Sequence, residues 1–183
     1  MSELIRELRF FVSDFDGVFT DNNVYLNSKG QEFVRCSRSD GYGIRMLKAA
    51  NEMGLANLEI SILSTETNKV VNRRAAKLKV ECFSGIENKL TFLKEVYFPL
   101  FGLDIERGLS QLVYLGNDLN DLAIMKKAKV SFAPKDSHPL VLKNASFVLK
   151  SKLGGDGFVR EAIESILGKK NLLSIVDYLE SKH

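Results

Sequence analysis

Short apolar runs alternate with longer segments of helical periodicity along most of this chain. The apolar runs are residues 8–12, 58–63, 112–115, 130–132 and 147–149, and the helical segments are residues 41–53, 68–78, 88–98 and 119–127. Helices placed between strands make successive strands parallel, and strands that are apolar throughout are buried on both faces. The pattern therefore predicts an α/β fold, a parallel sheet flanked by helices.

The sequence gives no sign of a division into separate units. Its 183 residues suit one domain with a full core, and no linker, repeat or low-complexity stretch interrupts them. We therefore expect residues 1–183 to form a single domain. Residues 24–26 and 32–34 flank a turn that contains Gly30, which predicts a β-hairpin insertion at about residues 22–36. The pattern fits a hairpin beside an active site, a hairpin that pairs with another subunit, or a plain surface hairpin.

The first apolar run ends in two carboxylates, Asp14 and Asp16, within the stretch Asp-Phe-Asp-Gly-Val-Phe-Thr-Asp at residues 14–21. Ligands bind at the carboxyl ends of strands in open α/β sheets. Two acids held there repel each other unless a cation or a proton lies between them. A metal site is therefore the first hypothesis, with one carboxylate as metal ligand and nucleophile and the other as acid and base. An isolated Asp-x-Asp is common in surface turns, but the longer stretch is more specific.

Two single residues are further candidates. Ser64 follows the second apolar run, where a hydroxyl and the amides of the next helix can bind a phosphate. Taken alone, it fits a helix N-cap better. Lys89 stands near the start of a helical segment, where a cation is slightly unfavourable for the helix dipole. A role in neutralising a phosphate explains that position, although a solvated lysine is the more common case.

A second acidic group follows the third apolar run, in the stretch Gly-Asn-Asp-Leu-Asn-Asp at residues 116–121. Its oxygen-bearing side chains, Asn117, Asp118 and Asp121, suit Mg²⁺. A capped helix start explains them equally well when they are considered alone. Acids, a hydroxyl, a lysine and more acids nevertheless occur in order, and three of the four groups follow an apolar run. Chance placement of all four is a poor explanation.

Composition narrows the class of partner. The formal net charge of +3 is too small to indicate nucleic acid, but it suits a small anionic substrate. Cys36 and Cys82 have no metal-like spacing and fit free thiols in a reducing compartment. The first residues carry acids and lack a long apolar segment, so we expect neither a signal peptide nor a membrane span. These features predict a cytoplasmic protein.

Together these motifs resemble the haloacid dehalogenase superfamily of phosphatases, in family order. Two further segments, residues 40–45 (Asp-Gly-Tyr-Gly-Ile-Arg) and 154–161 (Gly-Gly-Asp-Gly-Phe-Val-Arg-Glu), resemble its capless branch. That branch hydrolyses 3-deoxy-ulosonic acid phosphates and includes octulosonate 8-phosphate phosphatases, nononate 9-phosphate phosphatases and phosphatase-like domains of acylneuraminate cytidylyltransferases. The resemblance covers residues 8–167 and implies a Rossmann-like core without a large cap domain. A C-terminal tail of about residues 151–183 completes the chain, and residues 169–183 lie outside the resemblance.

The resemblance implies a mechanism with an aspartyl-phosphate intermediate. Asp14 is expected to attack phosphorus, and Asp16 to protonate the leaving oxygen and then activate water. Ser64 and Lys89 are expected to bind the phosphoryl oxygens. Mg²⁺ is expected on Asp14, the backbone carbonyl of Asp16, and the fourth motif. The implied metal ligands of that motif are Asn117, Asp118 and Asp121.

One position departs from the family pattern, because many relatives carry Asp where this chain has Asn117. An amide oxygen is a normal but uncharged ligand for a hard cation, so we expect Mg²⁺ to bind less tightly. The family also implies a homotetramer with active sites at subunit interfaces. The hairpin is expected to pack between subunits, and the 154–161 segment to close over a neighbour's site.

Residues that contact the substrate are implied only by the resemblance, and they are Thr20, Asp40, Glu66, Arg74, Lys77 and Arg160. Glu66 favours a nine-carbon acid such as nononate or neuraminate 9-phosphate, whereas residues 40–45 favour octulosonate 8-phosphate. The first substrate implies sialic-acid-like glycan synthesis, and the second implies lipopolysaccharide synthesis. An exposed basic helix face explains Arg74 and Lys77 equally well, and a surface charge explains Arg160.

Two other classes of protein remain as alternatives. One is a non-catalytic oligomerisation module related to cytidylyltransferase C-terminal domains, which tend to lack the nucleophile or the general acid. Asp14, Asp16, Ser64 and Lys89 are all present here, and only Asn117 favours the module. The other is a receiver-type signalling domain, whose paired acids lie side by side without Asp-x-Asp-Gly. The enzyme fits the sequence better than either.

Overall fold

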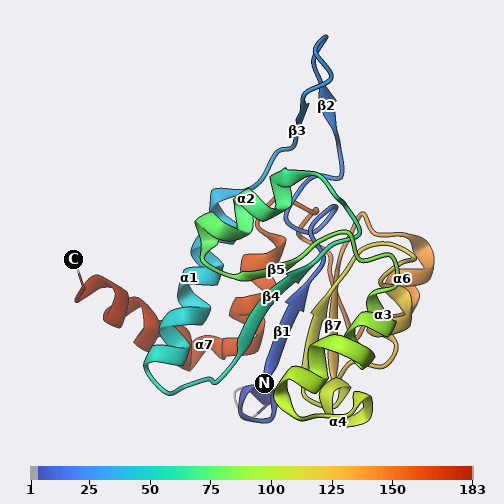
Figure 1. Ribbon diagram of the computed structural model, residues 1–183. Coiled ribbons are helices and arrows are strands. Elements are labelled where there is room, and N and C mark those ends of the chain that lie inside the picture. Colours follow the sequence, from blue (N-terminus) through green and yellow to red (C-terminus); the bar gives the residue numbers. More distant parts are fainter. Residues whose placement is uncertain (1–3, 183) are drawn as a thin grey trace.

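A six-stranded parallel sheet forms the centre of the computed structural model, which describes residues 4–182 (Figure 1). The strands lie in the order β5-β4-β1-β6-β7-β8, and every neighbouring pair is parallel. Their bounds are β1 Phe10–Ser13, β4 Glu59–Leu63, β5 Glu81–Phe83, β6 Leu112–Leu115, β7 Val130–Pro134 and β8 Phe147–Leu149. The chain adds β4 and β5 on one side of β1 and β6 to β8 on the other. This order makes the carboxyl end of β1 a topological switch point, where ligands bind in open sheets.

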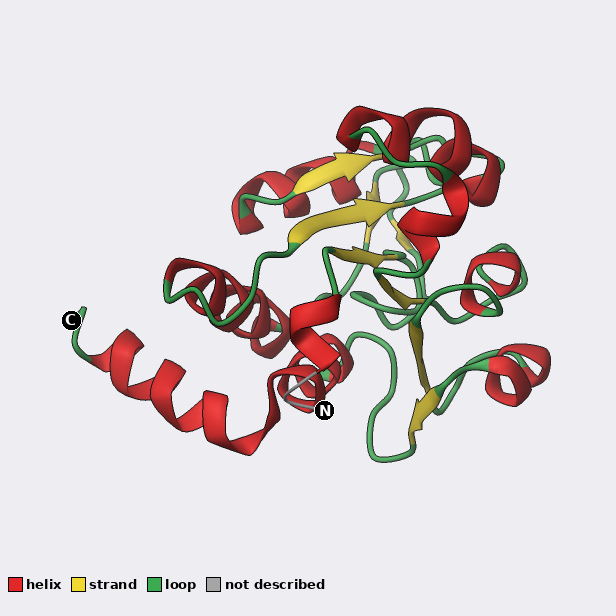
Figure 2. Ribbon diagram, turned by 90° about the horizontal axis from the view of Figure 1, so that it is seen from below, coloured by secondary structure: helices red, strands yellow, loops and turns green. Residues whose placement is uncertain are grey.

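Helices cover both faces of the sheet, as the views in Figures 1 and 2 show. One face carries α1 Arg38–Glu52, α2 Lys69–Leu78 and α7 Phe158–Glu180. The other carries α3 Lys89–Phe92, α4 Ile105–Leu109, α5 Leu122–Met125 and α6 Pro139–Asn144, together with a π-helix at Leu93–Tyr97 and a 3₁₀ helix at Phe98–Phe101. A further 3₁₀ helix, Leu4–Glu7, packs on the α1 and α7 side. Side chains of β1 alternate between the two cores: Phe11 packs with α1 and α7, while Phe10 and Val12 pack under the other layer. The predicted α/β architecture is confirmed.

The structure differs from the predicted elements in several places, and α4 and α6 are among the elements that were not predicted. β5 is missing from the prediction because its three residues, Glu-Cys-Phe, are too short and mixed to form an apolar run. The helix expected over 119–127 begins only at Leu122, because residues 117–121 form a loop around Asp121. α7 extends through most of the segment described above as a tail, despite a kink at Gly168 with φ of 73°.

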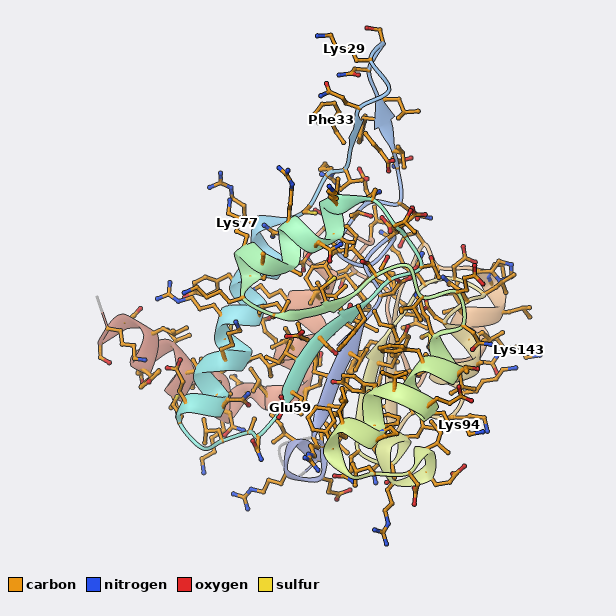
Figure 3. All side chains as sticks on the ribbon, in the orientation of Figure 1. Lys29, Phe33, Glu59, Lys77, Lys94 and Lys143 are labelled. Atoms are coloured by element: carbon orange, nitrogen blue, oxygen red, sulfur yellow. The ribbon has the colours of Figure 1, made fainter. Side chains whose placement is uncertain are left out.

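The predicted hairpin is present and stands apart from the main sheet. β2 Tyr25–Leu26 pairs antiparallel with β3 Glu32–Phe33. The Asn27 side chain closes the turn by accepting hydrogen bonds from the amides of Lys29 (2.9 Å) and Gln31 (3.0 Å). The hairpin projects from the body at the carboxyl end of the sheet, with Lys29 near its tip (Figures 1 and 3). Its apolar side chains are largely exposed.

The glycine-rich segment that precedes α7 lies against the acidic loop of its own chain. The Gly155 amide donates to the Val18 carbonyl (3.0 Å), and a Cβ atom at Gly154 would lie 2.0 Å from the Gly17 carbonyl oxygen. Only glycine permits this approach. Gly154 and Gly155 therefore lie against residues 17–21 of their own chain, and closure of the segment over a neighbouring subunit stays a prediction.

Candidate active site

Three parallel strands end side by side at the candidate site. Asp14 follows β1, Ser64 follows β4, and Asn117 lies two residues beyond β6. Ladder hydrogen bonds extend past the strands: the Asp14 amide donates to Leu115 (2.9 Å) and the Ser64 amide to Phe83 (2.9 Å). The sheet therefore fixes the backbone on which these side chains stand, as the sequence predicted.

Lys89 is the charged centre of the site. The side chain is fully buried, and its Nζ lies 2.8 Å from Asp14 Oδ1 and 2.8 Å from Asp121 Oδ1. Burial lowers the pKa of Lys89, but the two carboxylates outweigh burial and the pKa is raised. The lysine is therefore an ammonium group held between two acids, and the solvated lysine considered above is excluded.

The two acids of the first motif differ in environment. Burial and the neighbouring Asp121 raise the pKa of Asp14 well above its usual range, although Lys89 opposes them. Positive charge close to Asp14 favours its ionised form against this burial. Asp16 is half-buried, and burial together with the charge of Glu66 raises its pKa to about 6. A carboxyl with that pKa can both donate and accept a proton near neutrality.

Asp14, Asn117 and Asp118, whose oxygen atoms suit Mg²⁺, line one pocket. Asn117 Oδ1 is buried and has no hydrogen-bond partner. The Asn117 amide group packs against the acidic loop, where a Cβ at Gly17 would lie 2.0 Å from its Nδ2. Among residues 4–182, no three Asp, Glu, His or Cys side chains form a metal-holding group. The donor set therefore depends on the Asn117 oxygen and backbone carbonyls besides Asp14, and these hard oxygens fit Mg²⁺.

The two aspartates of the fourth motif have different surroundings. Both oxygens of Asp121 are engaged: Oδ1 accepts from Lys89 and from Tyr114 (2.7 Å), and Oδ2 accepts from the amides of Asn117 (2.9 Å) and Asp118 (3.3 Å). Asp121 thus holds the loop and the lysine. Asp118 is exposed and lines the pocket, where a carboxylate can bind a metal-bound water.

Ser64 and Thr20 are fully buried beside the pocket. The Ser64 hydroxyl accepts a hydrogen bond from the Glu66 amide (3.1 Å). The Thr20 hydroxyl accepts from the Gly17 amide (3.1 Å) and contacts the Asp16 side chain. In this arrangement both hydroxyls shape loops, and their predicted contacts with a phosphate and a leaving group remain predictions.

A pocket of about 380 Å³ opens above these groups. Its lining residues are Asp14, Asp16, Asn22, Thr65, Glu66, Asn117, Asp118, Leu119 and Asn120. Four of these nine are carboxylates and none is a cation, so the pocket is acidic apart from the Lys89 beneath it. Asn22, Thr65, Leu119 and Asn120 were not predicted as lining residues. In the sequence, the only sign of their role was that they lie next to the motifs. In the structure, Asn22 has a left-handed φ of 61°.

Of the six predicted substrate residues only Glu66 lines this pocket; Thr20 is buried beside it, and the other four lie elsewhere in their own chain. Asp40 is buried and accepts from the amides of Arg160 (3.0 Å) and Gly157 (3.3 Å), so it caps α7. The Arg160 side chain pairs with Glu164 (2.7 Å). Arg74 and Lys77 line a separate pocket of about 260 Å³ on α1 and α2, and Lys77 points outward in Figure 3.

Comparisons with known proteins agree with this geometry. The family of haloacid dehalogenase-like hydrolases matches residues 88–161. The chain is 32% identical over 161 residues to the 3-deoxy-D-manno-octulosonate 8-phosphate phosphatase KdsC of Yersinia pestis. The matched region covers 87% of this chain and 80% of that protein.

Two solved structures are also similar. An HAD family hydrolase from Streptomyces avermitilis has a TM-score of 0.77 and 36% identity, over 90% of this chain and 88% of the other. The 3-deoxy-D-manno-octulosonate 8-phosphate phosphatase of Moraxella catarrhalis was solved with magnesium, phosphate and the sugar acid. It has a TM-score of 0.82 and 25% identity, and the match covers 100% of this chain and 97% of the other.

No helix within residues 4–182 is long and apolar enough to span a bilayer.

The strand-end acids, the buried lysine and the similarity along most of the sequence point to one family. The chain belongs to the haloacid dehalogenase-like hydrolases, in the branch of the 3-deoxy-D-manno-octulosonate 8-phosphate phosphatases.

Proposed function

We propose that this protein is a Mg²⁺-dependent phosphatase that hydrolyses a 3-deoxy-ulosonic acid phosphate through an aspartyl-phosphate intermediate. The observation that carries the proposal is the buried Lys89 held 2.8 Å from Asp14, beside the unpartnered oxygen of Asn117. Curated relatives named as octulosonate 8-phosphate phosphatases support the eight-carbon substrate and a place in lipopolysaccharide synthesis.

Asp14 is the nucleophile in this proposal. Its Oδ1 receives hydrogen bonds from Lys89 and from the Phe15 amide (2.7 Å), which hold the carboxylate in one orientation. Fixing a nucleophile before the substrate arrives removes part of the entropic cost of attack. Lys89 carries the positive charge that stabilises the phosphoryl group as negative charge moves onto its oxygens.

Asp16 transfers protons at the leaving-group side. With a pKa of about 6, it gives a proton to the leaving sugar oxygen and then takes one from the water that attacks the aspartyl phosphate. Bound Mg²⁺ would supply charge neutralisation for the phosphate and for Asp14. The residues that would hold it are Asp14, Asn117 and the backbone carbonyl of Asp16, with Asp118 acting through water.

The charge of the pocket supports an active site shared between subunits. Four carboxylates line it against the single ammonium of Lys89, yet the substrate carries a phosphate and a carboxylate. Mg²⁺ offsets only part of this excess, so cations contributed by another subunit would favour substrate binding. Arg74, Lys77 and Arg160 lie away from their own pocket and are suitable donors to a neighbour's site. We therefore include in the proposal a homotetramer in which the exposed hairpin packs between subunits.

Glu66 supports a second substrate of the same class. It lines the pocket close enough to Asp16 to raise the pKa of that acid, so a substrate can reach it. A carboxylate there accepts hydrogen bonds from sugar hydroxyls, which favours a longer nine-carbon acid phosphate. The curated relatives favour the octulosonate, and a direct comparison decides between the two.

Phosphate release from a panel of substrates tests the proposal. The panel contains octulosonate 8-phosphate, nononate 9-phosphate, neuraminate 9-phosphate and glucose 6-phosphate, with and without Mg²⁺. We expect one ulosonic acid phosphate to exceed glucose 6-phosphate at least about a hundredfold in kcat/KM, since contacts to the acid add roughly 3 kcal/mol. Comparable turnover of all four contradicts the substrate class. Full activity of Asp14→Asn contradicts the mechanism, and no release from any ester supports a non-catalytic module.

A further inference from the structure

A buried tyrosine lies directly beneath the candidate site. Tyr114 belongs to β6, three residues before Asn117, and its side chain is fully buried. Its ring packs in the apolar core that also contains Phe10, Val12 and Leu93. A phenylalanine of the same shape would fill this position without a hydroxyl to desolvate. The hydroxyl therefore has a polar task, and its partner shows what that task is.

The partner of the hydroxyl is an atom that Lys89 also uses. Tyr114 donates a hydrogen bond to Asp121 Oδ1 at 2.7 Å, and Lys89 Nζ donates to the same oxygen at 2.8 Å. Lys89 divides its charge between this oxygen and Asp14 Oδ1, also at 2.8 Å. Tyr114, Asp121, Lys89 and Asp14 thus form one continuous chain of contacts that ends at the expected nucleophile.

The direction of the first hydrogen bond follows from the two groups involved. A carboxylate oxygen accepts and the phenol O–H donates, so Tyr114 is the donor to Asp121 Oδ1. Asp121 Oδ2 is held by the Asn117 amide at 2.9 Å, so the carboxylate cannot rotate to exchange its oxygens. The hydroxyl consequently competes with Lys89 for a single, fixed oxygen.

We propose that Tyr114 is a positioning residue for Lys89, which acts through Asp121. By donating to Asp121 Oδ1, the phenol offsets part of the negative charge that would otherwise draw Lys89 away from Asp14. More of the ammonium charge is then available to Asp14 and to the phosphoryl group. The inference rests on the proposed roles of Asp14 and Lys89, and nothing in it depends on the identity of the sugar.

The test compares Tyr114→Phe with Tyr97→Phe. Tyr97 is a matched control because it is a buried tyrosine of the same core, and its hydroxyl bonds Ser61 at 3.1 Å instead of a site residue. With para-nitrophenyl phosphate as substrate, we expect Tyr114→Phe to lower kcat about tenfold with KM unchanged, and Tyr97→Phe to leave both unchanged. An unchanged kcat in Tyr114→Phe, or an equal loss in both variants, overturns the proposal.

A spectrum of the lysine ammonium groups gives an answer that does not depend on turnover. In protein labelled with ¹⁵N-lysine, the Lys89 signal is identified by its loss in Lys89→Met. We expect this signal to shift in Tyr114→Phe and to stay in place in Tyr97→Phe. If the parent hydrolyses no phosphate ester, the proposed function fails, and the spectrum alone decides the Tyr114 inference. A Lys89 signal that does not move in Tyr114→Phe overturns it.

Discussion

At the residue scale, Asn117 is the residue whose side chain most affects both stability and metal binding in the proposed site. Its Oδ1 is a buried acceptor without a partner, which costs stability unless something binds there. An amide oxygen satisfies a cation without adding a negative charge to a pocket that already has four carboxylates. In the proposed role as a Mg²⁺ ligand, the residue would lessen repulsion in the metal-free protein and weaken attraction for the cation.

Replacing Asn117 with Asp separates these two effects. We expect Asn117→Asp to bind Mg²⁺ about tenfold more tightly, because a charged ligand adds roughly 1.4 kcal/mol of attraction. Without metal, the variant is expected to unfold at a lower urea concentration, since the new charge lies beside Asp14. Calorimetric Mg²⁺ titration and urea unfolding measure the two quantities.

Asn120→Asp is the control for this experiment, because Asn120 lines the same pocket but is exposed. It adds the same charge, so a general electrostatic effect would appear in both variants. Equal Mg²⁺ affinity of Asn117→Asp and the parent would show that Asn117 is not a ligand.

Single residues also show what the sequence could predict. Asp14, Asp16 and Asn117 were predicted because each follows a recognisable apolar run. Tyr114 was not, because a tyrosine within Leu-Val-Tyr-Leu fits a core strand and its hydroxyl partner lies across a turn. Asp40 was assigned to the substrate, but it caps a helix 120 residues away, and no local pattern indicates such a contact.

At the scale of elements, the close contact between α1 and α7 determines how these two helices pack on their shared face of the sheet. Gly43 of α1 meets the backbone of α7, where an added Cβ would lie 2.8 Å from Arg160 Cα. Such a contact with backbone cannot be relieved by moving a side chain. The two helices can therefore approach this closely only because residue 43 has no side chain.

A pair of glycine substitutions in α1 tests this contact. We expect Gly43→Ala to lower the free energy of unfolding by about 1–3 kcal/mol, because the helices must separate. Gly41→Ala is the control: its Cβ would meet only side-chain ends, Arg74 Nη2 and Leu78 Cδ2, both at 3.2 Å. Alanine also favours the helix there, so a change within about 1 kcal/mol is expected. Equal urea midpoints for the two variants would contradict this view of the helix contact.

Elements that depend on long-range contacts were the hardest to predict. The strands at 112–115 and 147–149 were placed correctly from apolar character alone. α7 was not, because Gly168 and the two lysines after it have the character of a helix end. Tertiary packing carries the helix past this kink: Ile175 and Leu179 beyond it are buried against the core of α1.

At the scale of the whole molecule, the hairpin is the feature that a single chain does not explain. Its side chains Val24, Tyr25, Leu26 and Phe33 are each more than half exposed, and the hairpin itself stands away from the body (Figures 1 and 3). An exposed apolar group of this kind marks a surface that another protein covers. Together with the acidic pocket, it supports assembly from several copies of this chain.

Charging the hairpin tests the assembly. We expect the parent to have the mass of a tetramer by light scattering, and Leu26→Lys to have a smaller mass and a lower kcat/KM for the sugar acid phosphate. Leu100→Lys is the matched control, because Leu100 is 69% exposed against 70% for Leu26 but lies outside the hairpin. A parent that is a fully active monomer would exclude the shared site.

The contact between α1 and α7 also affects how the chain folds as it is synthesised. Asp40 gains its folded-state partner, the amide of Arg160, only after 120 further residues have been made. At typical translation rates of about 5–20 residues per second, this delay is on the order of ten seconds. During that time the part of α1 that packs against α7 has no native cover, and contacts of such long range form slowly. This face of the sheet is therefore expected to be completed only when synthesis of the chain is nearly finished.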